Sequence, residues 1–240
     1  MEFEICIATD LGGLRKNNED GFYVNDIGIY NTTEYFLYKK IKVPIFAFVA
    51  DGVGGTRAGE EATGVCVKTA LSSTIPYDDC EIIGFIDKVN QRVCELRMTI
   101  DTACTLAGIL IGEDSIYSFN VGDSKVFSLS RGFLNQLSID DTLSGLLGEI
   151  TNDKEPLIQY IGKEGLLPHI KKVDKLSTFL ICTDGLTDML SLDDIELFFE
   201  KESDLKELTA KLVEQAKEKG GQDNITLIII RPVKEGMGND

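Results

Sequence analysis

Three aspartates stand in the sequence where a folded sheet would bring them together. Asp51 and Asp184 each follow an apolar run, and Asp223 precedes one at 225–230. In antiparallel neighbours, the end of one strand and the start of the next lie at the same edge of the sheet. Carboxylates that meet there repel each other, and their burial without a counter-charge is costly. Such a site would bind a hard divalent cation with oxygen ligands, Mg²⁺ or Mn²⁺.

A turn is the alternative interpretation of a lone Asp-Gly pair, because both residues favour turns. That interpretation weakens for Asp51 and Asp184, since both follow runs of strand type. Further along, residues 9–20 hold Arg15 beside an acidic pair, and a tight turn contains Asp123. Arg15 is either an ordinary surface charge or, given the acidic pair, a ligand for phosphate.

Short runs rich in Ile, Val, Phe and Thr, bounded by Gly, Asp and Asn, predict the strands that position these residues. They are 4–9, 21–25, 45–50, 106–111, 115–120, 125–129, 178–182 and 225–230. The connections after 106–111 and 115–120 have three and four residues, which favours hairpins over parallel crossovers. We therefore expect a mainly antiparallel sheet system.

Helical periodicity with one apolar face occurs at 58–72, 79–97, 193–200 and 205–219. Helices that alternate with groups of strands in this way pack outside the sheets, as in α+β proteins. Residues 140–165 have weak periodicity and many polar and Gly positions, which predicts a flap that leaves the core. Residues 234–240 are expected to be a polar tail.

The composition excludes several classes of function. Among 240 residues, 24 Lys and Arg stand against 40 Asp and Glu, a net charge of −16. Because phosphate backbones and anionic membranes attract basic surfaces, we expect neither a nucleic-acid nor a membrane partner. The longest apolar runs have strand length, and the first residues lack the pattern of a signal peptide, so a cytoplasmic location is expected.

The cysteine and histidine content excludes other chemistry. Six scattered cysteines, most of them in apolar runs, are expected to be reduced core thiols. No Cys-x5-Arg pattern is present, which argues against a cysteine nucleophile. The single His169 excludes a site with several histidines, and its loop-like surroundings favour a surface position. Ser124 would need a histidine partner to act as a nucleophile.

Five segments occur in an order and spacing that resemble one known family. They are Arg15-x-x-x-Glu19-Asp20, Ala50-Asp51-Gly52-Val53-Gly54-Gly55-x-x-x-Gly59-Glu60, Val121-Gly122-Asp123-Ser124-Lys125, Cys182-Thr183-Asp184-Gly185-Leu186-Thr187-Asp188 and Asp223-Asn224-Ile225-Thr226. The family is the metal-dependent Ser/Thr protein phosphatases of the protein phosphatase 2C (PPM) type, in its bacterial form. The resemblance implies one catalytic domain over 1–233 and a four-layer αββα sandwich of two antiparallel sheets flanked by helices.

The resemblance also implies a centre of two Mg²⁺ or Mn²⁺ ions, with a third and weaker site. The implied metal-site residues are Glu19, Asp20, Asp51, Gly52, Asp123, Asp184 and Asp223. Asp51 would bridge two ions, and the Gly52 carbonyl would bind one of them. Asp123, with Asp184, matches the third site. Arg15 would bind the substrate phosphate through its planar fork of donors, and Asn224 would support the ligands from behind.

The implied activity is hydrolysis of phosphoserine and phosphothreonine in proteins by a metal-activated water, without a phosphoenzyme. The partner would be a phosphoprotein made by a Ser/Thr kinase. Two alternatives are a non-catalytic phosphoprotein-binding module on the same fold and a hydrolase of small phosphoesters. The first alternative would need a lost metal ligand, and every such position is filled.

The sequence departs from the family pattern at four places. Val53 stands where many eukaryotic members have a histidine that is a candidate general acid, so that role is vacant. Asp140-Asp141 replaces the usual Asp-His before the flap. Ala103-Cys104-Thr105 replaces Gly-Thr-Thr, and Lys125 replaces an arginine. These changes concern the leaving group and the flap, which we expect to influence substrate choice if it borders the site.

Overall fold

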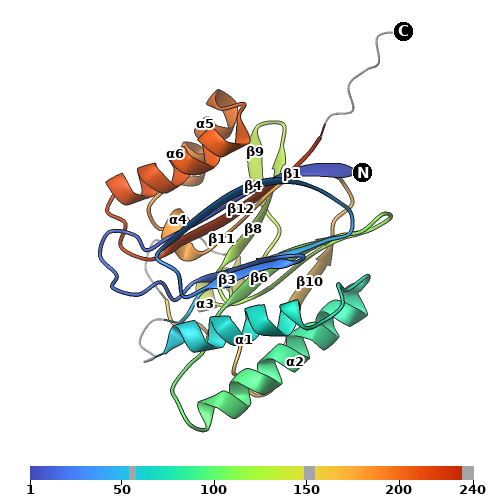
Figure 1. Cartoon of the computed structure of the whole chain (residues 1–240), viewed down its shortest axis with the longest axis vertical. Helices are drawn as coiled ribbons and strands as arrows, with labels where there is room; N and C mark the ends of the chain where they lie inside the picture. The colour runs from blue at the N-terminus through green and yellow to red at the C-terminus, as the bar shows by residue number, and fades with distance from the viewer. Residues whose placement is uncertain (54–57, 149–154, 234–240) are drawn as a thin grey trace.

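Two six-stranded antiparallel sheets pack face to face in the computed structural model, which describes residues 1–53, 58–148 and 155–233 (Figure 1). The first sheet has the order β4 (Glu34–Lys42), β1 (Glu2–Asp10), β12 (Ile225–Pro232), β11 (Thr178–Cys182), β8 (Lys125–Ser130) and β9 (Phe133–Gln136). The second has the order β10 (His169–Lys172), β7 (Ile116–Val121), β6 (Leu106–Ile111), β5 (Ile45–Ala50), β2 (Gly21–Val24) and β3 (Ile27–Tyr30).

Helices cover the outer face of each sheet (Figure 1). The second sheet is covered by α1 (Gly59–Leu71) and α2 (Asp79–Arg97). The first is covered by α4 (Asp184–Thr187), α5 (Leu192–Lys201) and α6 (Leu205–Glu218), and the short α3 (Leu143–Leu147) lies in the predicted flap region. The predicted four-layer αββα sandwich is therefore confirmed.

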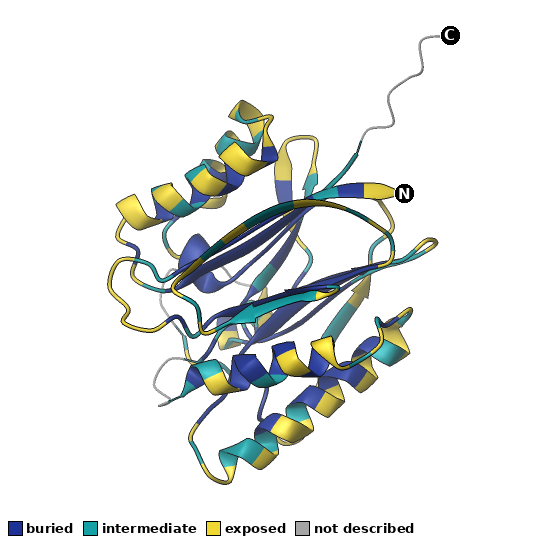
Figure 2. Cartoon of the chain, in the orientation of Figure 1, coloured by how far each residue is buried: buried dark blue, intermediate teal, exposed yellow. Residues whose placement is uncertain are grey.

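The core follows from the alternation of side chains along the strands. In β1, Ile5 and Ile7 face the other sheet, whereas Cys6 and Ala8 face the helices of their own side. Three apolar clusters result, one between the sheets and one under each helical layer. Figure 2 shows the buried residues concentrated in the strands and on the inner helix faces. A strand between two such layers is apolar throughout, and β5 is buried along its whole length.

The eight predicted strands and four predicted helices exist, with ends within two residues of the expected ones. The prediction missed β3, β4, β9, β10, α3 and α4. Four of these strands are short or lie at a sheet edge, where half-exposed residues give no clear apolar alternation. Cys6, Cys66, Cys104 and Cys182 are buried in the core as expected.

One predicted hairpin is wrong. β6 and β7 do pair, but β7 and β8 belong to different sheets, so the chain crosses from one sheet to the other between them. Gly122 permits this crossing, because it has φ +94° and a Cβ there would lie 2.7 Å from a methyl group of Thr105. The connection of three residues, 122–124, is too short for a parallel crossover, and it joins two layers of the sandwich instead.

The flap region leaves the first sheet after β9, and the chain then joins the second sheet at β10. Thr142 caps α3 by accepting a hydrogen bond from the Gly145 amide, and Gly148 ends the helix in the left-handed region. Residues 149–154 of this region and the expected tail, 234–240, lie outside the described residues. Among the helices that the structure describes, none combines the length and apolar character needed to cross a bilayer.

Candidate metal centre

Six acidic side chains meet at one end of the sandwich from separate parts of the chain. Asp51 follows β5, Asp184 follows β11 and Asp223 precedes β12. Asp123 lies in the crossing after β7, and Glu19 and Asp20 lie in the loop after β1. Burial, followed by the charges of Asp20 and Asp184, raises the pKa of Asp51 well above its ordinary value. The predicted convergence of Asp51, Asp184 and Asp223 is what the structure shows, but not at the edge of one sheet, because Asp51 follows a strand of the second sheet and the other two flank strands of the first.

Asp20 is the most deeply buried of these groups. Its Oδ2 accepts a hydrogen bond of 3.0 Å from the Thr183 hydroxyl, whereas its Oδ1 is buried without a hydrogen-bond partner in the described residues. Burial raises the pKa of Asp20 to about 7, and the charges of Asp184 and Asp223 act in the same direction. A buried carboxylate oxygen without a donor is energetically unfavourable, so a cation at this point would stabilise the chain.

Asp123 lies in the crossing between the sheets. Burial and then the charge of Asp184 raise the pKa of Asp123 to about 6, while Lys125 acts against them. The Lys125 ammonium donates to the Asp123 carbonyl at 2.9 Å and pairs with Asp140 at 2.8 Å. Lysine therefore fulfils a holding role in this turn, at the position where the resemblance predicts arginine.

Thr105 joins the crossing to the end of β5. The Thr105 hydroxyl accepts a hydrogen bond of 3.1 Å from the Asp51 amide and lies 2.6 Å from the Ser124 hydroxyl. The Thr105 amide donates a hydrogen bond of 2.8 Å to the Asp51 carbonyl. Ser124 is fully buried by these contacts, which is incompatible with an exposed serine nucleophile. The 103–105 stretch thus retains a hydroxyl where it contacts the centre, despite the replacement of Gly-Thr by Ala-Cys.

Gly52 is closely enclosed by two other members of the site. A Cβ at Gly52 would lie 2.7 Å from the Glu19 side chain and 2.8 Å from the Gly59 backbone, so only glycine fits. Burial, followed by the charge of Glu60, raises the pKa of Glu19. Glu60 Oε2 is itself buried without a hydrogen-bond partner in the described residues. Residues 54–57, which complete the glycine-rich motif, lie outside the described residues.

Asn224 holds the loop that carries the acidic pair. Its side-chain oxygen accepts the Glu19 amide at 2.8 Å, and its amide group donates to the carbonyls of Leu11 and Asn17 at 2.9 and 3.0 Å. One side chain therefore fixes both ends of the 11–19 segment. This contact fits the supporting role predicted for Asn224.

Arg15 lies at the rim of the centre. Its Nη2 is 2.5 Å from Asp223 Oδ2, and its side chain is 41% exposed. The hydrogen bond to Asp223 raises the pKa of Arg15, so the guanidinium stays charged. Arg15 can thus bind an anion that approaches from solvent while it remains next to the carboxylates.

The centre carries more negative charge than its own cations offset. Near the six carboxylates, the described residues contribute the cations Arg15 and Lys125. In the described chain, only two carboxylates and a thiol at the start of α2, Asp78, Asp79 and Cys80, place three potential ligand atoms mutually within 4.8 Å. No three carboxylates of the centre do so. The orphaned Asp20 oxygen and the all-oxygen donor set fit a hard divalent cation.

Comparison with known proteins assigns the chain to a family. Residues 34–227 match the family described as Protein phosphatase 2C. The chain belongs to the protein phosphatase 2C family. The serine/threonine phosphatase stp of Listeria innocua is 28% identical over 97% of both chains. The protein phosphatase PhpP of Streptococcus pneumoniae is 28% identical over 95% of this chain and 96% of its own.

Solved structures agree with the protein phosphatase 2C assignment. The serine/threonine phosphatase of S. agalactiae superposes with a TM-score of 0.78 at 26% identity, over 96% of this chain and all of its own. The serine/threonine phosphatase PstP/Ppp of Mycobacterium tuberculosis superposes with a TM-score of 0.79 at 23% identity, over 96% of this chain and 99% of its own. At that identity the second comparison bears on the fold alone.

Two residues next to the carboxylates of this protein phosphatase 2C chain were not predicted from the sequence. Glu60 was part of a matching motif but had no role assigned, and its burial beside Glu19 was not foreseen. Asp141 stands out in the sequence only as a departure from the family pattern, yet it is fully buried and accepts a hydrogen bond from His169 Nε2 at 2.8 Å. His169 is consequently half-buried rather than a plain surface residue. The unusual Asp at position 141 was the available signal, but its partner is 28 residues away.

Proposed function

We propose that this chain is a metal-dependent protein phosphatase that hydrolyses phosphoserine and phosphothreonine in proteins. The observation that supports it most is the convergence of six carboxylates, one with an orphaned buried oxygen, at one end of the sandwich. The relatives named as serine/threonine phosphatases, which match almost the full length, support the same class of substrate. We also propose that residues 1–233 form one catalytic domain.

The proposed metal ligands are those that the resemblance implies. Asp51 and the Gly52 carbonyl would hold one Mg²⁺ or Mn²⁺ ion, and Asp51, Asp184 and Asp223 would hold a second. Asp123, with Asp184, would hold a third, and Glu19 and Asp20 would orient water molecules. Ions bound there would supply a nucleophilic water at neutral pH and offset the charge of the phosphoryl group.

The chain's own residues would perform the remaining tasks. Arg15, half-exposed at the rim, would bind two phosphate oxygens through its planar fork and orient the ester for in-line attack by water. The products would be inorganic phosphate and the serine or threonine alcohol. Val53 has no proton to donate, so the leaving oxygen would take its proton from water.

The test is release of inorganic phosphate from a phosphothreonine peptide by the purified protein with Mn²⁺. EDTA should abolish release, and Asp184→Ala, purified in parallel, should be inactive and so exclude a contaminating phosphatase. Saturable peptide binding without turnover would instead favour the non-catalytic module. Efficient turnover of p-nitrophenyl phosphate alone would favour a hydrolase of small phosphoesters.

A further inference from the structure

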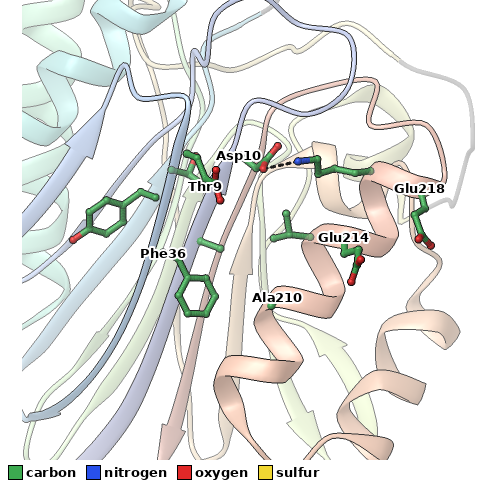
Figure 3. Close-up of a pocket in the computed structure, with 11 residues that line it drawn as sticks. Thr9, Asp10, Phe36, Ala210, Glu214 and Glu218 are labelled. Atoms are coloured by element: carbon green, nitrogen blue, oxygen red, sulfur yellow. Dashed lines mark hydrogen bonds and ion pairs between the residues drawn. The ribbon is translucent and has the colours of Figure 1, made fainter.

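A cavity of about 460 Å³ lies outside the metal centre, between the free edge of the first sheet and α6 (Figure 3). One wall is formed by the last residues of β1 and the first residues of β4. The other wall is the second half of α6. Because α6 packs over β1 and β12, it leaves the start of β4 uncovered, and Phe36 is 44% exposed there. A volume of this size is typical of ligand pockets.

The cavity combines an apolar floor with an acidic rim. Ala8 and Phe36 are cross-strand partners and face Ala210 and Val213 of α6. Four carboxylates surround them, from Asp10, Glu34, Glu214 and Glu218. The one lysine of the cavity, Lys217, bonds Asp10 at 2.8 Å. In the described chain Glu34, Glu214 and Glu218 make no ion pair, and the negative end of the α6 dipole adds to their field.

The cavity lies at the same end of the strands as the metal centre. Glu34 pairs with Asp10, Asp10 pairs with Ile225, and the Thr226 carbonyl accepts the Thr183 amide. Neighbouring strands are about 4.8 Å apart, so the Glu34 strand lies about 14 Å from the strand that ends next to Asp184. An extended peptide covers that distance in about four residues.

The cavity also shares a turn with Arg15. Asp10 closes β1 and accepts the Gly12 amide at 2.8 Å, at the start of the loop that carries Arg15. A Cβ at Gly12 would lie 2.2 Å from the Asp223 carbonyl, so this turn also contacts the metal centre directly. A peptide whose phosphate lies at Arg15 can therefore extend along this turn into the cavity.

We propose that this cavity is a docking site for the substrate, and that it selects phosphoproteins with a lysine or arginine next to an apolar residue about four positions from the phosphorylated residue. This inference rests on the proposed phosphatase function and adds a substrate class to it. The cation would bind the unpaired carboxylates, and the apolar neighbour would cover Phe36. Since the protein carries a net charge of −16, basic segments are also the ones that it attracts from a distance.

The experiment compares phosphothreonine peptides that differ at one pair of positions, Arg-Leu, Ala-Leu or Glu-Leu, placed about four residues before or after the phosphothreonine. With Mn²⁺ present and the pair on one side of the phosphothreonine, the wild-type protein should hydrolyse the Arg-Leu peptide with a KM roughly fivefold below that of the Ala-Leu peptide. This is the size of effect expected for a few partly exposed ion pairs. The Glu-Leu peptide should be the poorest substrate. High salt should weaken the preference.

One double variant and one control variant locate the effect. The double variant Glu214→Gln/Glu218→Gln should lose the preference, while its turnover of p-nitrophenyl phosphate stays at the wild-type rate. Glu207→Gln lies on the same helix outside the cavity and should keep the preference. An unchanged preference in the double variant, or an equal loss in the control, would overturn the proposal.

Direct binding separates this proposal from the proposed function. If no peptide is hydrolysed, the phosphatase assignment fails, but anisotropy of a labelled, unphosphorylated Arg-Leu peptide still tests docking. Binding that weakens in the double variant and persists in Glu207→Gln supports the cavity. Binding of a polyamine such as spermidine, with none of the peptide, would assign the cavity to a small cation and overturn substrate docking.

Discussion

At the scale of single residues, Arg15 contacts one anion in this structure and is proposed to bind a second. It is bonded to Asp223 at 2.5 Å in this structure, and in the proposed reaction it binds phosphate. Both partners are anions, so the guanidinium offsets carboxylate charge until another cation or a substrate arrives. Its partial exposure keeps it accessible to solvent.

We expect Arg15→Ala to raise KM for a phosphothreonine peptide by at least about tenfold, because hydrogen bonds to charged groups contribute about 1.5–3 kcal/mol. Mn²⁺ binding should not weaken, since the carboxylates lose a competing cation. Steady-state kinetics and calorimetric Mn²⁺ titration measure the two effects separately. A lower affinity for Mn²⁺ in this variant would show that Arg15 supports the metal ligands instead.

Asp141 connects the flap region to the turn that carries Asp123. Its Oδ2 accepts the Gly122 amide at 2.8 Å, and its Oδ1 accepts Gln159 Nε2 and His169 Nε2, each at 2.8 Å. One buried carboxylate therefore joins the sheet crossing, the returning flap and the start of β10. The side chain acts on the centre through the backbone of Gly122.

Both carboxylate oxygens of Asp141 accept hydrogen bonds. In Asp141→Asn, an NH₂ group, which cannot accept, replaces one of these oxygens. We expect the free energy of unfolding to fall by about 1–3 kcal/mol, the cost of an unsatisfied buried polar group. We also expect a higher Mn²⁺ concentration for half-maximal activity, because the Asp123 turn loosens. Urea unfolding and Mn²⁺ titration measure these effects. Asp114→Asn, an exposed position, is the control, and equal behaviour of the two variants would contradict the assignment.

At the scale of elements, α5 shows how one acidic side chain fixes a helix start. Ser191 caps the helix by accepting the Asp194 amide at 3.2 Å, and Asp194 in turn accepts the Ser191 amide at 3.1 Å. The Lys219 ammonium at the end of α6 pairs with the same carboxylate at 2.7 Å. The hydrogen bonds from Lys219 and Ser191 lower the pKa of Asp194 to about 2.

Asp194→Asn should lower the free energy of unfolding at pH 7 by about 1 kcal/mol or less, since the side chain is partly exposed. The folded pKa lies below the ordinary value, so this stabilisation is complete above pH 4 and is lost as the pH falls towards 2. Urea unfolding at pH 7, 5 and 3 should show a difference from the wild type that shrinks at pH 3. A constant difference would exclude the charged form of Asp194 as its cause.

The elements also show what a sequence can and cannot predict here. β5, β12 and α2 are strongly patterned, and their ends were predicted to within two residues. β4 was missed because this edge strand has no buried residue, and its exposed positions include an aromatic, Phe36, as well as lysines. The crossing at Gly122 was misread because a short connection says that two strands are close, not that they share a sheet.

The same reasoning applies to the site. Asp51, Asp184 and Asp223 follow from strand ends, which local sequence marks. The bond between Asp141 and His169 depends on how the flap region folds back onto β7 and β10, and no local pattern encodes it. Glu19, Asp20 and Asp123 were predicted as site residues from the family resemblance alone. In the structure, burial raises the pKa of each of them.

At the scale of the whole molecule, the acidic centre sets how stability depends on pH. Without bound cations, the pKa of Asp20 is about 7 and that of Asp123 about 6, both above the value in an unfolded chain. The folded chain therefore holds these protons to a higher pH than the unfolded chain does. Stability is present at pH 4 and is lost as the pH rises towards 7.

In EDTA, we expect the thermal midpoint of the protein to decrease as the pH is raised from 5 to 8. Mn²⁺ should raise this midpoint more at pH 8 than at pH 5. Binding that displaces protons should also show a buffer-dependent heat at pH 6. Differential scanning calorimetry with and without Mn²⁺ checks the first expectation. The same Mn²⁺-induced increase at both pH values would mean that these carboxylates are already ionised in the metal-free fold.

The passage of the chain between the two sheets at Gly122 has a mechanical consequence. Asp51 belongs to one sheet and Asp184 to the other, while Asp123 lies on the short segment that joins them. A slide of one sheet over the other would change the separations among all three carboxylates together. The occupancy of the proposed third metal position should therefore report small relative displacements of the two halves of the sandwich.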